Sequence, residues 1–205
     1  MTALDLVRQG VPRLRQAVAE RDLGLEGLHI WRDRHAPVTH RWVSDDRRDV
    51  FSISKTFTSV AVGIAQAEGL LDLDDPVLAH LLDLRDYLMP CLFEPIAIPN
   101  PQWHRCPLGF PLGAVGLFLR TEEIAQLGET LLNNGQFDDR QLVPADYVQL
   151  MTSETTATNR PDPDNQTYGL HCWLCSRDGA WRMDGMYGIV DRPVQFPRPR
   201  RGAHR

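Results

Sequence analysis

The chain has 205 residues, a formal net charge of −5 and a composition with 42% hydrophobic and 24% charged residues. This length suits one domain with a substantial core, or one domain with a small lobe. The acidic balance argues against a nucleic-acid-binding protein, and no apolar run approaches the roughly 18 residues that a membrane span needs. Because the first ten residues lack the apolar core of a signal peptide, we expect a cytoplasmic protein.

Hydrophobic periodicity predicts the elements of the N-terminal half. Residues 4–22 have the pattern of an amphipathic helix that is interrupted or restarted at Pro12. Residues 28–33 and 38–43 are typical of two strands joined by a turn. From residue 52 onward, apolar side chains recur at helical spacing and predict a buried helix of about five turns. These side chains are Ile53, Phe57, Val60, Ile64, Ala67 and Leu71.

The C-terminal half is predicted to hold short helices followed by strands. The helices are expected at 83–90, at 121–132 and from Pro144 through Met151. A polar loop follows at 154–166, and strands are expected over Tyr168–Leu174 and Trp181–Tyr187.

Ser52 and Lys55 form a candidate nucleophile and base at the start of the periodic helix. Lys55 is the only lysine among 22 lysines and arginines, and an ammonium, unlike a guanidinium, can lose its proton when it is desolvated. Side chains three positions apart share one helix face, with Cβ atoms about 5–6 Å apart. The pair indicates serine acyl transfer, in which free N–H groups at the helix start stabilise the oxyanion. The alternative is an N-cap serine followed by a solvated first-turn charge.

Residues 50–77 closely resemble the nucleophile helix of the serine β-lactamase and penicillin-binding-protein superfamily, in its class C-like branch. The segment begins Val-Phe-Ser-Ile-Ser-Lys-Thr-Phe and ends Leu-Asp-Leu-Asp-Asp-Pro-Val. A weaker likeness extends over most of residues 5–188. The resemblance implies an α/β (α+β) fold of the β-lactamase/transpeptidase type. Its antiparallel sheet would come from both ends of the chain and be flanked by helices, with a reduced helical lobe.

The same resemblance implies a chemistry. The substrate would be a small molecule with an ester, amide or β-lactam carbonyl, and Ser52 would form a covalent acyl-enzyme. No metal or organic cofactor is implied, and neither a nucleic acid nor a membrane is expected as a partner.

Two of the three elements that such enzymes use depart from the family pattern. No tyrosine is followed two places later by asparagine or serine, so the Y-x-N element is missing, and its loss resembles an internal deletion near 78–83. By the resemblance, Gly185 corresponds to the glycine of the third element, and the Met186 N–H to the second oxyanion donor. Met183 replaces the usual Lys, His or Trp. Arg182 could supply positive charge instead, unless strand alternation turns it to the opposite face.

The resemblance divides the chain into a β-lactamase-related domain over 1–190 and a disordered tail over 191–205. The tail contains three prolines and five arginines and has no periodicity. After Gly188 the family continues into two more strands and a helix, whereas these prolines cannot supply a central strand. We therefore expect a C-terminally truncated chain whose catalytic strand is an exposed edge.

His171, Cys172 and Cys175 form an H-C-x-x-C pattern, which suits a zinc or redox site when a second pair lies nearby. His104 and Cys106 are candidates for that pair. The strand-like alternation around the pattern favours buried structural cysteines instead. The remaining grouped histidines, on the predicted hairpin, are interpreted as surface residues rather than ligands. They are His29, His35 and His40.

Two functions follow from these patterns. The first is serine hydrolysis of a carbonyl substrate through Ser52. The second is a catalytically inactive remnant or binding module of the same family, which the missing tyrosine element and the proline-rich end favour. Both stay open on the sequence alone, as does the oligomeric state.

Overall fold

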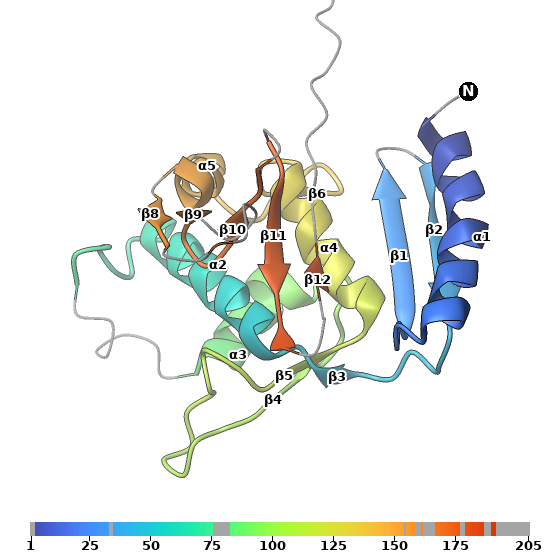
Figure 1. Ribbon diagram of the computed structural model, residues 1–205. Coiled ribbons are helices and arrows are strands. Elements are labelled where there is room, and N and C mark those ends of the chain that lie inside the picture. Colours follow the sequence, from blue (N-terminus) through green and yellow to red (C-terminus); the bar gives the residue numbers. More distant parts are fainter. Residues whose placement is uncertain are drawn as a thin grey trace, which may run out of the picture.

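The computed structural model describes residues 3–32, 35–75, 83–153, 155–158, 161, 167–176, 179–186 and 190–191. Helices and antiparallel strands alternate along the chain (Figure 1). The predicted mixed fold of antiparallel strands flanked by helices is confirmed. Within the described ranges, no helix has both the length and the apolar character to cross a membrane.

The N-terminal part is a long helix beside a hairpin. Helix α1 (Ala3–Arg21) continues through Pro12 as one element. Strands β1 (Gly27–Arg32) and β2 (His35–Arg41) pair antiparallel. They form a two-stranded sheet of their own, so the expected sheet built from both ends of the chain is wrong for the described strands. β1 instead contacts α4 (Thr121–Leu132), which connects the hairpin to the rest of the molecule (Figure 1).

The segment that carries the candidate nucleophile starts as a tight turn before it becomes a helix. After β3 (Arg48–Asp49), a 3₁₀ turn called η1 (Phe51–Ile53) leads into helix α2 (Ser54–Ala67). The apolar stripe predicted along this helix is buried from Ile53 through Ile64. Its C-terminal end lies earlier than the expected Leu71, because Gly69 turns the chain with a φ of +70°.

The middle of the chain packs as short elements against α2. Helix α3 (Leu84–Leu88) continues into a π-helical turn, η3 (Met89–Phe93), which together cover the predicted helix at 83–90. Strands β4 (Gln102–Trp103) and β5 (Leu117–Leu119) then join β3 in a three-stranded sheet of order β3-β5-β4.

The remaining helices follow the sequence predictions closely. α4 occupies the expected 121–132, with the Glu123 carboxylate accepting a hydrogen bond from the backbone N–H of Arg120 at 2.8 Å. α5 (Ala145–Ser153) begins after Pro144, as predicted. Between them, β6 (Gln136–Phe137) and β7 (Arg140–Gln141) form a small hairpin.

The C-terminal sheet differs from the prediction at two places. Its order is β12-β11-β10-β9-β8, and every neighbouring pair is antiparallel. Its strands are β8 (Thr156–Ala157), β9 (Thr167–Tyr168), β10 (Trp173–Leu174), β11 (Trp181–Asp184) and β12 (Val190–Asp191).

The first correction is that residues 168–174 are not one strand but a hairpin. The backbone N–H of Gly169 donates to the Cys172 carbonyl at 2.8 Å, which closes the turn between β9 and β10. A Cβ atom at position 169 would lie 2.1 Å from the Met151 carbonyl oxygen, so only glycine fits this close approach. Periodicity over seven residues did not reveal the turn.

The second correction concerns the strand expected to be an exposed edge. β12 pairs with the end of β11, with Met183 opposite Asp191 and Asp184 opposite Val190. Asp191 therefore belongs to a strand rather than to the predicted tail over 191–205. The rest of that tail, and most of the expected deletion near 78–83, lie outside the described residues.

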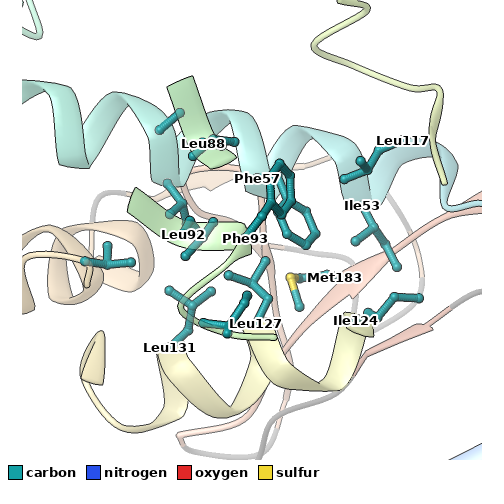
Figure 2. Close-up of a cluster of buried hydrophobic side chains, with 14 of the residues drawn as sticks. Ile53, Phe57, Leu88, Leu92, Phe93, Leu117, Ile124, Leu127, Leu131 and Met183 are labelled. Carbon is teal, nitrogen blue, oxygen red and sulfur yellow. The ribbon is translucent and has the colours of Figure 1, made fainter. Parts of the chain in front are cut away.

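The core lies between α2, the α3–η3 segment, α4 and β11 (Figure 2). Phe57 of α2 stacks on Phe93 of η3, with ring centroids 5.6 Å apart. Met183 of β11 is 1% exposed and packs into the same cluster as Ile53. Ile53 directly follows the candidate nucleophile Ser52 in the chain. Since burying one such side chain stabilises a fold by about 1.5–3 kcal/mol, this cluster fixes the start of α2 against the sheet.

Candidate active site

Ser52 and Lys55 lie next to one another at the start of α2. The Lys55 Nζ donates a hydrogen bond to the Ser52 Oγ at 2.6 Å. Both residues are half-buried, so the pair is reachable from solvent. Lys55 Nζ also donates to the Ala114 carbonyl oxygen at 3.3 Å. This geometry allows the serine proton to pass to the lysine nitrogen once the amine is neutral.

The turn that carries Ser52 is held in an unusual conformation. Phe51, directly before Ser52, has a φ of +48°, a left-handed value that few non-glycine residues adopt. Its backbone N–H donates to the Asp49 Oδ1 at 2.8 Å. The same oxygen accepts the backbone N–H of Gly116 at 3.0 Å. One oxygen of the Asp49 carboxylate is therefore hydrogen-bonded both to the turn that carries Ser52 and to the segment that precedes β5.

That segment lies along the first turns of α2. The Thr58 hydroxyl donates to the Gly113 carbonyl at 2.6 Å, and the Leu117 N–H donates to the Ser54 Oγ at 3.3 Å. Together with the Lys55–Ala114 bond, these contacts position residues 113–117 beside the Ser52–Lys55 pair. This segment carries no motif of its own, so nothing in the sequence marks it as part of the site.

The end of β11 approaches the pair from the sheet. β11 contacts η1, the turn that contains Ser52 (Figure 1). Gly185 and Met186 follow this strand directly, and Met186 is 58% exposed. The strand expected over Trp181–Tyr187 ends at Asp184, so Gly185 and Met186 follow the strand that contacts the serine-bearing turn rather than lying within it.

Met183 and Arg182 are the two side chains of β11 that could serve the third element, and both contact other residues of the fold. Met183 points into the core (Figure 2). Arg182 is on the opposite face, where its Nε donates to the Asp184 carboxylate at 2.9 Å and its guanidinium lies 5.8 Å from the Trp173 ring centroid. Strand alternation therefore turns Arg182 away from the Met183 face.

A histidine reaches the same face of α2. The Thr56 hydroxyl donates to the backbone carbonyl of His171 at 2.7 Å. His171 is exposed and has a left-handed φ of +62°. Packing around its ring and the positive charge of Lys55 both lower the pKa of His171 below its usual 6.5. In the sequence, His171 stands out only as part of a possible metal pattern.

None of the described tyrosines has a hydroxyl bonded to Ser52 or Lys55. The Tyr87 hydroxyl donates to Glu68 at 2.9 Å, at the far end of α2. Glu68 lies sixteen positions after Ser52, which corresponds to about 24 Å at a helical rise of 1.5 Å per residue. Tyr147 is buried and hydrogen-bonds with Ser59 at 3.1 Å. Tyr187 lies outside the described residues.

The cysteine pattern does not assemble a metal site in the part of the chain that the structure describes. No group of three or more His, Cys, Asp or Glu side chains there is arranged to hold an ion. Cys172 is buried with its thiol on the Met151 carbonyl at 3.3 Å, and burial raises its pKa to about 12. Cys175 lies on the other side of β10, beside Arg182 at 3.7 Å. The two thiols therefore have different neighbours.

The hairpin histidines are separate from the pair. His29 has a buried Nδ1 without a hydrogen-bond partner among the described residues, and burial lowers its pKa. His40 makes an edge contact with Trp42, with ring centroids 4.4 Å apart. The side chain of His35 is outside the described part.

Comparison with known proteins identifies similar sequences and folds. The sequence model of the family described as Beta-lactamase matches residues 7–95. A search of curated proteins finds no match. Among solved structures, a Bacillus anthracis protein named as a 6-aminohexanoate-dimer hydrolase is similar with a TM-score of 0.60 and 11% identity, over 87% of this chain and 72% of that one. A penicillin-binding protein from Bacillus halodurans has a TM-score of 0.58 and 11% identity, over 80% of this chain and 85% of that one.

Proposed function

We propose that the chain is a serine hydrolase of the serine β-lactamase and penicillin-binding-protein superfamily that acts through an acyl-enzyme on Ser52, supported by the Beta-lactamase family match over residues 7–95 and by the similar folds. The observation that carries the proposal is the 2.6 Å hydrogen bond between Lys55 Nζ and Ser52 Oγ. A nucleophile and its base need this contact before the proton can move.

In this proposal the reaction has two halves. Neutral Lys55 takes the Ser52 proton while Oγ attacks the carbonyl carbon, and the leaving group departs with that proton. Water then attacks the acyl carbon, the bond to Oγ breaks, and Ser52 recovers a proton. The backbone N–H groups of Ser52 and Met186 are the proposed oxyanion donors, since both lie where η1 meets the end of β11.

The substrate class follows from the carbonyl chemistry. A linear amide is the first candidate, because one similar structure is named as a hydrolase of the 6-aminohexanoate dimer. A β-lactam is the second, by likeness to the penicillin-binding protein. Both place an electrophilic carbonyl against Ser52, so one nucleophile serves either.

A catalytically inactive remnant is the second candidate function. It is favoured by the side chains that surround the pair. No described tyrosine is bonded to Ser52 or Lys55, and Met183 is buried in the core rather than offering a donor to substrate. General acid–base groups contribute about 10²–10⁴-fold, so the loss of one reduces turnover without removing the nucleophile.

Covalent labelling distinguishes the two candidates. Purified protein is treated in parallel with a fluorophosphonate and a penicillin, and its intact mass is measured, with Ser52→Ala as the control. If the protein is a hydrolase, we expect one adduct per chain, and this adduct should be absent from Ser52→Ala. A folded sample, verified by circular dichroism, that acquires no Ser52-dependent adduct from either reagent would support the remnant.

A further inference from the structure

We propose that His171 is a third proton-transfer residue of the Ser52–Lys55 site, which accepts a proton from the water that hydrolyses the acyl-enzyme. This inference rests on the proposed function and adds to it a residue outside the S-x-x-K pair. It also explains one member of the H-C-x-x-C pattern, for which the described residues offer no metal site.

The position of His171 is the first argument. Ser52, Lys55 and Thr56 stand at positions i, i+3 and i+4, which share one face at the start of a helix. The Thr56 hydroxyl binds the His171 carbonyl at 2.7 Å, so residue 171 lies over that face. The positive charge of Lys55 lowers the pKa of the His171 imidazole, which agrees with this placement.

The way the backbone is held is the second argument. His171 adopts a left-handed φ of +62° at the tip of the β9–β10 hairpin. A left-handed backbone is strained in residues other than glycine, and such strain is concentrated at functional sites. The turn is secured by the Gly169–Cys172 bond and by Leu170 donating to Met151 at 2.9 Å. These bonds use backbone atoms, so the imidazole is not needed to hold the turn.

The surroundings of the ring suit a base. The titratable groups that meet His171 are Lys55 from α2 and Tyr168 from β9, whose ring centroid lies 6.4 Å from that of His171. The adjacent Cys172 thiol is directed to Met151 and stays protonated. Partial burial and the Lys55 charge lower the pKa of His171, which favours the neutral imidazole, the form that can accept a proton.

The proton balance of the second half-reaction is then complete. Water transfers one proton to His171 as its oxygen bonds to the acyl carbon. When the tetrahedral intermediate collapses, the bond to Ser52 Oγ breaks and the imidazolium returns that proton to Oγ, directly or through Lys55. No further reactant is required.

The test separates acylation from deacylation. His171→Asn removes the base, while asparagine tolerates the left-handed backbone. Acylation is measured by the rate of adduct formation with a slowly released ester or penicillin, and deacylation by recovery of the unmodified mass. We expect acylation to change by less than about threefold and deacylation to slow by about 10²-fold or more, so that the adduct accumulates. His40→Asn, on the hairpin, is the matched control.

Two further measurements exclude a merely structural role. In the wild type the deacylation rate should fall as the pH drops through the lowered pKa of His171, and this acidic limb should vanish in His171→Asn. His171→Gly, which suits the positive φ, should regain deacylation when free imidazole is added. Normal release of the adduct by His171→Asn, with its acidic limb retained, would overturn the role of His171 and leave the Ser52 hydrolase standing. Absence of any Ser52-dependent adduct in the wild type would overturn both.

Discussion

The carboxylate of Asp49 accepts a hydrogen bond from the backbone N–H of Phe51, the residue that precedes the candidate nucleophile. Since the same Oδ1 also accepts the Gly116 N–H, Asp49 connects the left-handed turn before Ser52 to the segment that carries the Ala114 carbonyl. The candidate site thus depends on a residue that touches neither Ser52 Oγ nor Lys55 Nζ.

Asp49→Ala should therefore weaken both the fold and the site. Two backbone N–H groups lose their acceptor, which costs about 1–3 kcal/mol of unfolding free energy for each buried donor left unsatisfied. Urea unfolding measures this, and the rate of Ser52 labelling should fall with it. Asp49→Asn keeps an acceptor oxygen and should lose less, and Asp46→Ala, at an exposed position, is the control. Equal stability of Asp49→Ala and Asp46→Ala would show that these bonds contribute nothing.

Lys55→Arg tests whether the only lysine acts as a base. A guanidinium keeps the positive charge but does not deprotonate in proteins. Labelling of Ser52 by a fluorophosphonate should slow by about 10²–10⁴-fold, as for the loss of a general base. If Lys55→Arg labels at the wild-type rate, the charge rather than the proton transfer matters, and Lys55 is no base.

Two glycine substitutions test how tightly α2 packs. A Cβ atom at Gly63 would lie 2.3 Å from a Tyr147 ring carbon, whereas one at Gly10 in α1 would meet nothing within 4 Å. Gly63→Ala should lower the unfolding free energy by about 1–3 kcal/mol because the core is overpacked. Gly10→Ala should raise it by up to about 1 kcal/mol through helix propensity. Thermal unfolding of both variants gives the comparison, and opposite signs are expected.

Thiol labelling tests the placement of the cysteines. Burial raises the pKa of Cys172 to about 12 and that of Cys91 to about 11. Because the thiolate is the reactive form, both should alkylate slowly with iodoacetamide at pH 8 in the folded protein and rapidly in denaturant. Peptide mapping over time identifies each site. Fast alkylation of Cys172 under native conditions would contradict its burial beneath the β9–β10 turn.

Stability should fall as the pH drops below about 6.5, the ordinary histidine value. Burial lowers the pKa of His29 in the folded state and outweighs the opposing negative charge of Glu122. Between the folded and the unfolded pKa values, the unfolded chain therefore binds more protons. Protonation then favours unfolding, and the loss is complete below the folded pKa. His29→Gln should flatten this part of the stability profile, measured by urea unfolding between pH 7.5 and 5. An unchanged slope would show that His29 is not the group responsible.

Local patterns were sufficient for the helices and for the reactive pair. The stripe from Ile53 to Ile64 and the acidic start of α4 depend on neighbours within one or two turns, and the helices formed where these patterns occur. The three-residue spacing of Ser52 and Lys55 is likewise a local property, and the two side chains lie 2.6 Å apart. Helix geometry alone brings such side chains together.

Longer-range contacts decided the rest, because nothing in a short sequence window encodes them. The turn at Gly169 depends on the Met151 carbonyl, and the pairing of β11 with β12 places Met183 opposite Asp191 and Asp184 opposite Val190. By itself, the sequence determined that this protein has a serine and a lysine on one helical turn. Only the tertiary structure decided that Asp49 and residues 113–117 hold this turn and that His171 lies over it, since hydrogen bonds between distant segments form only after the core has packed.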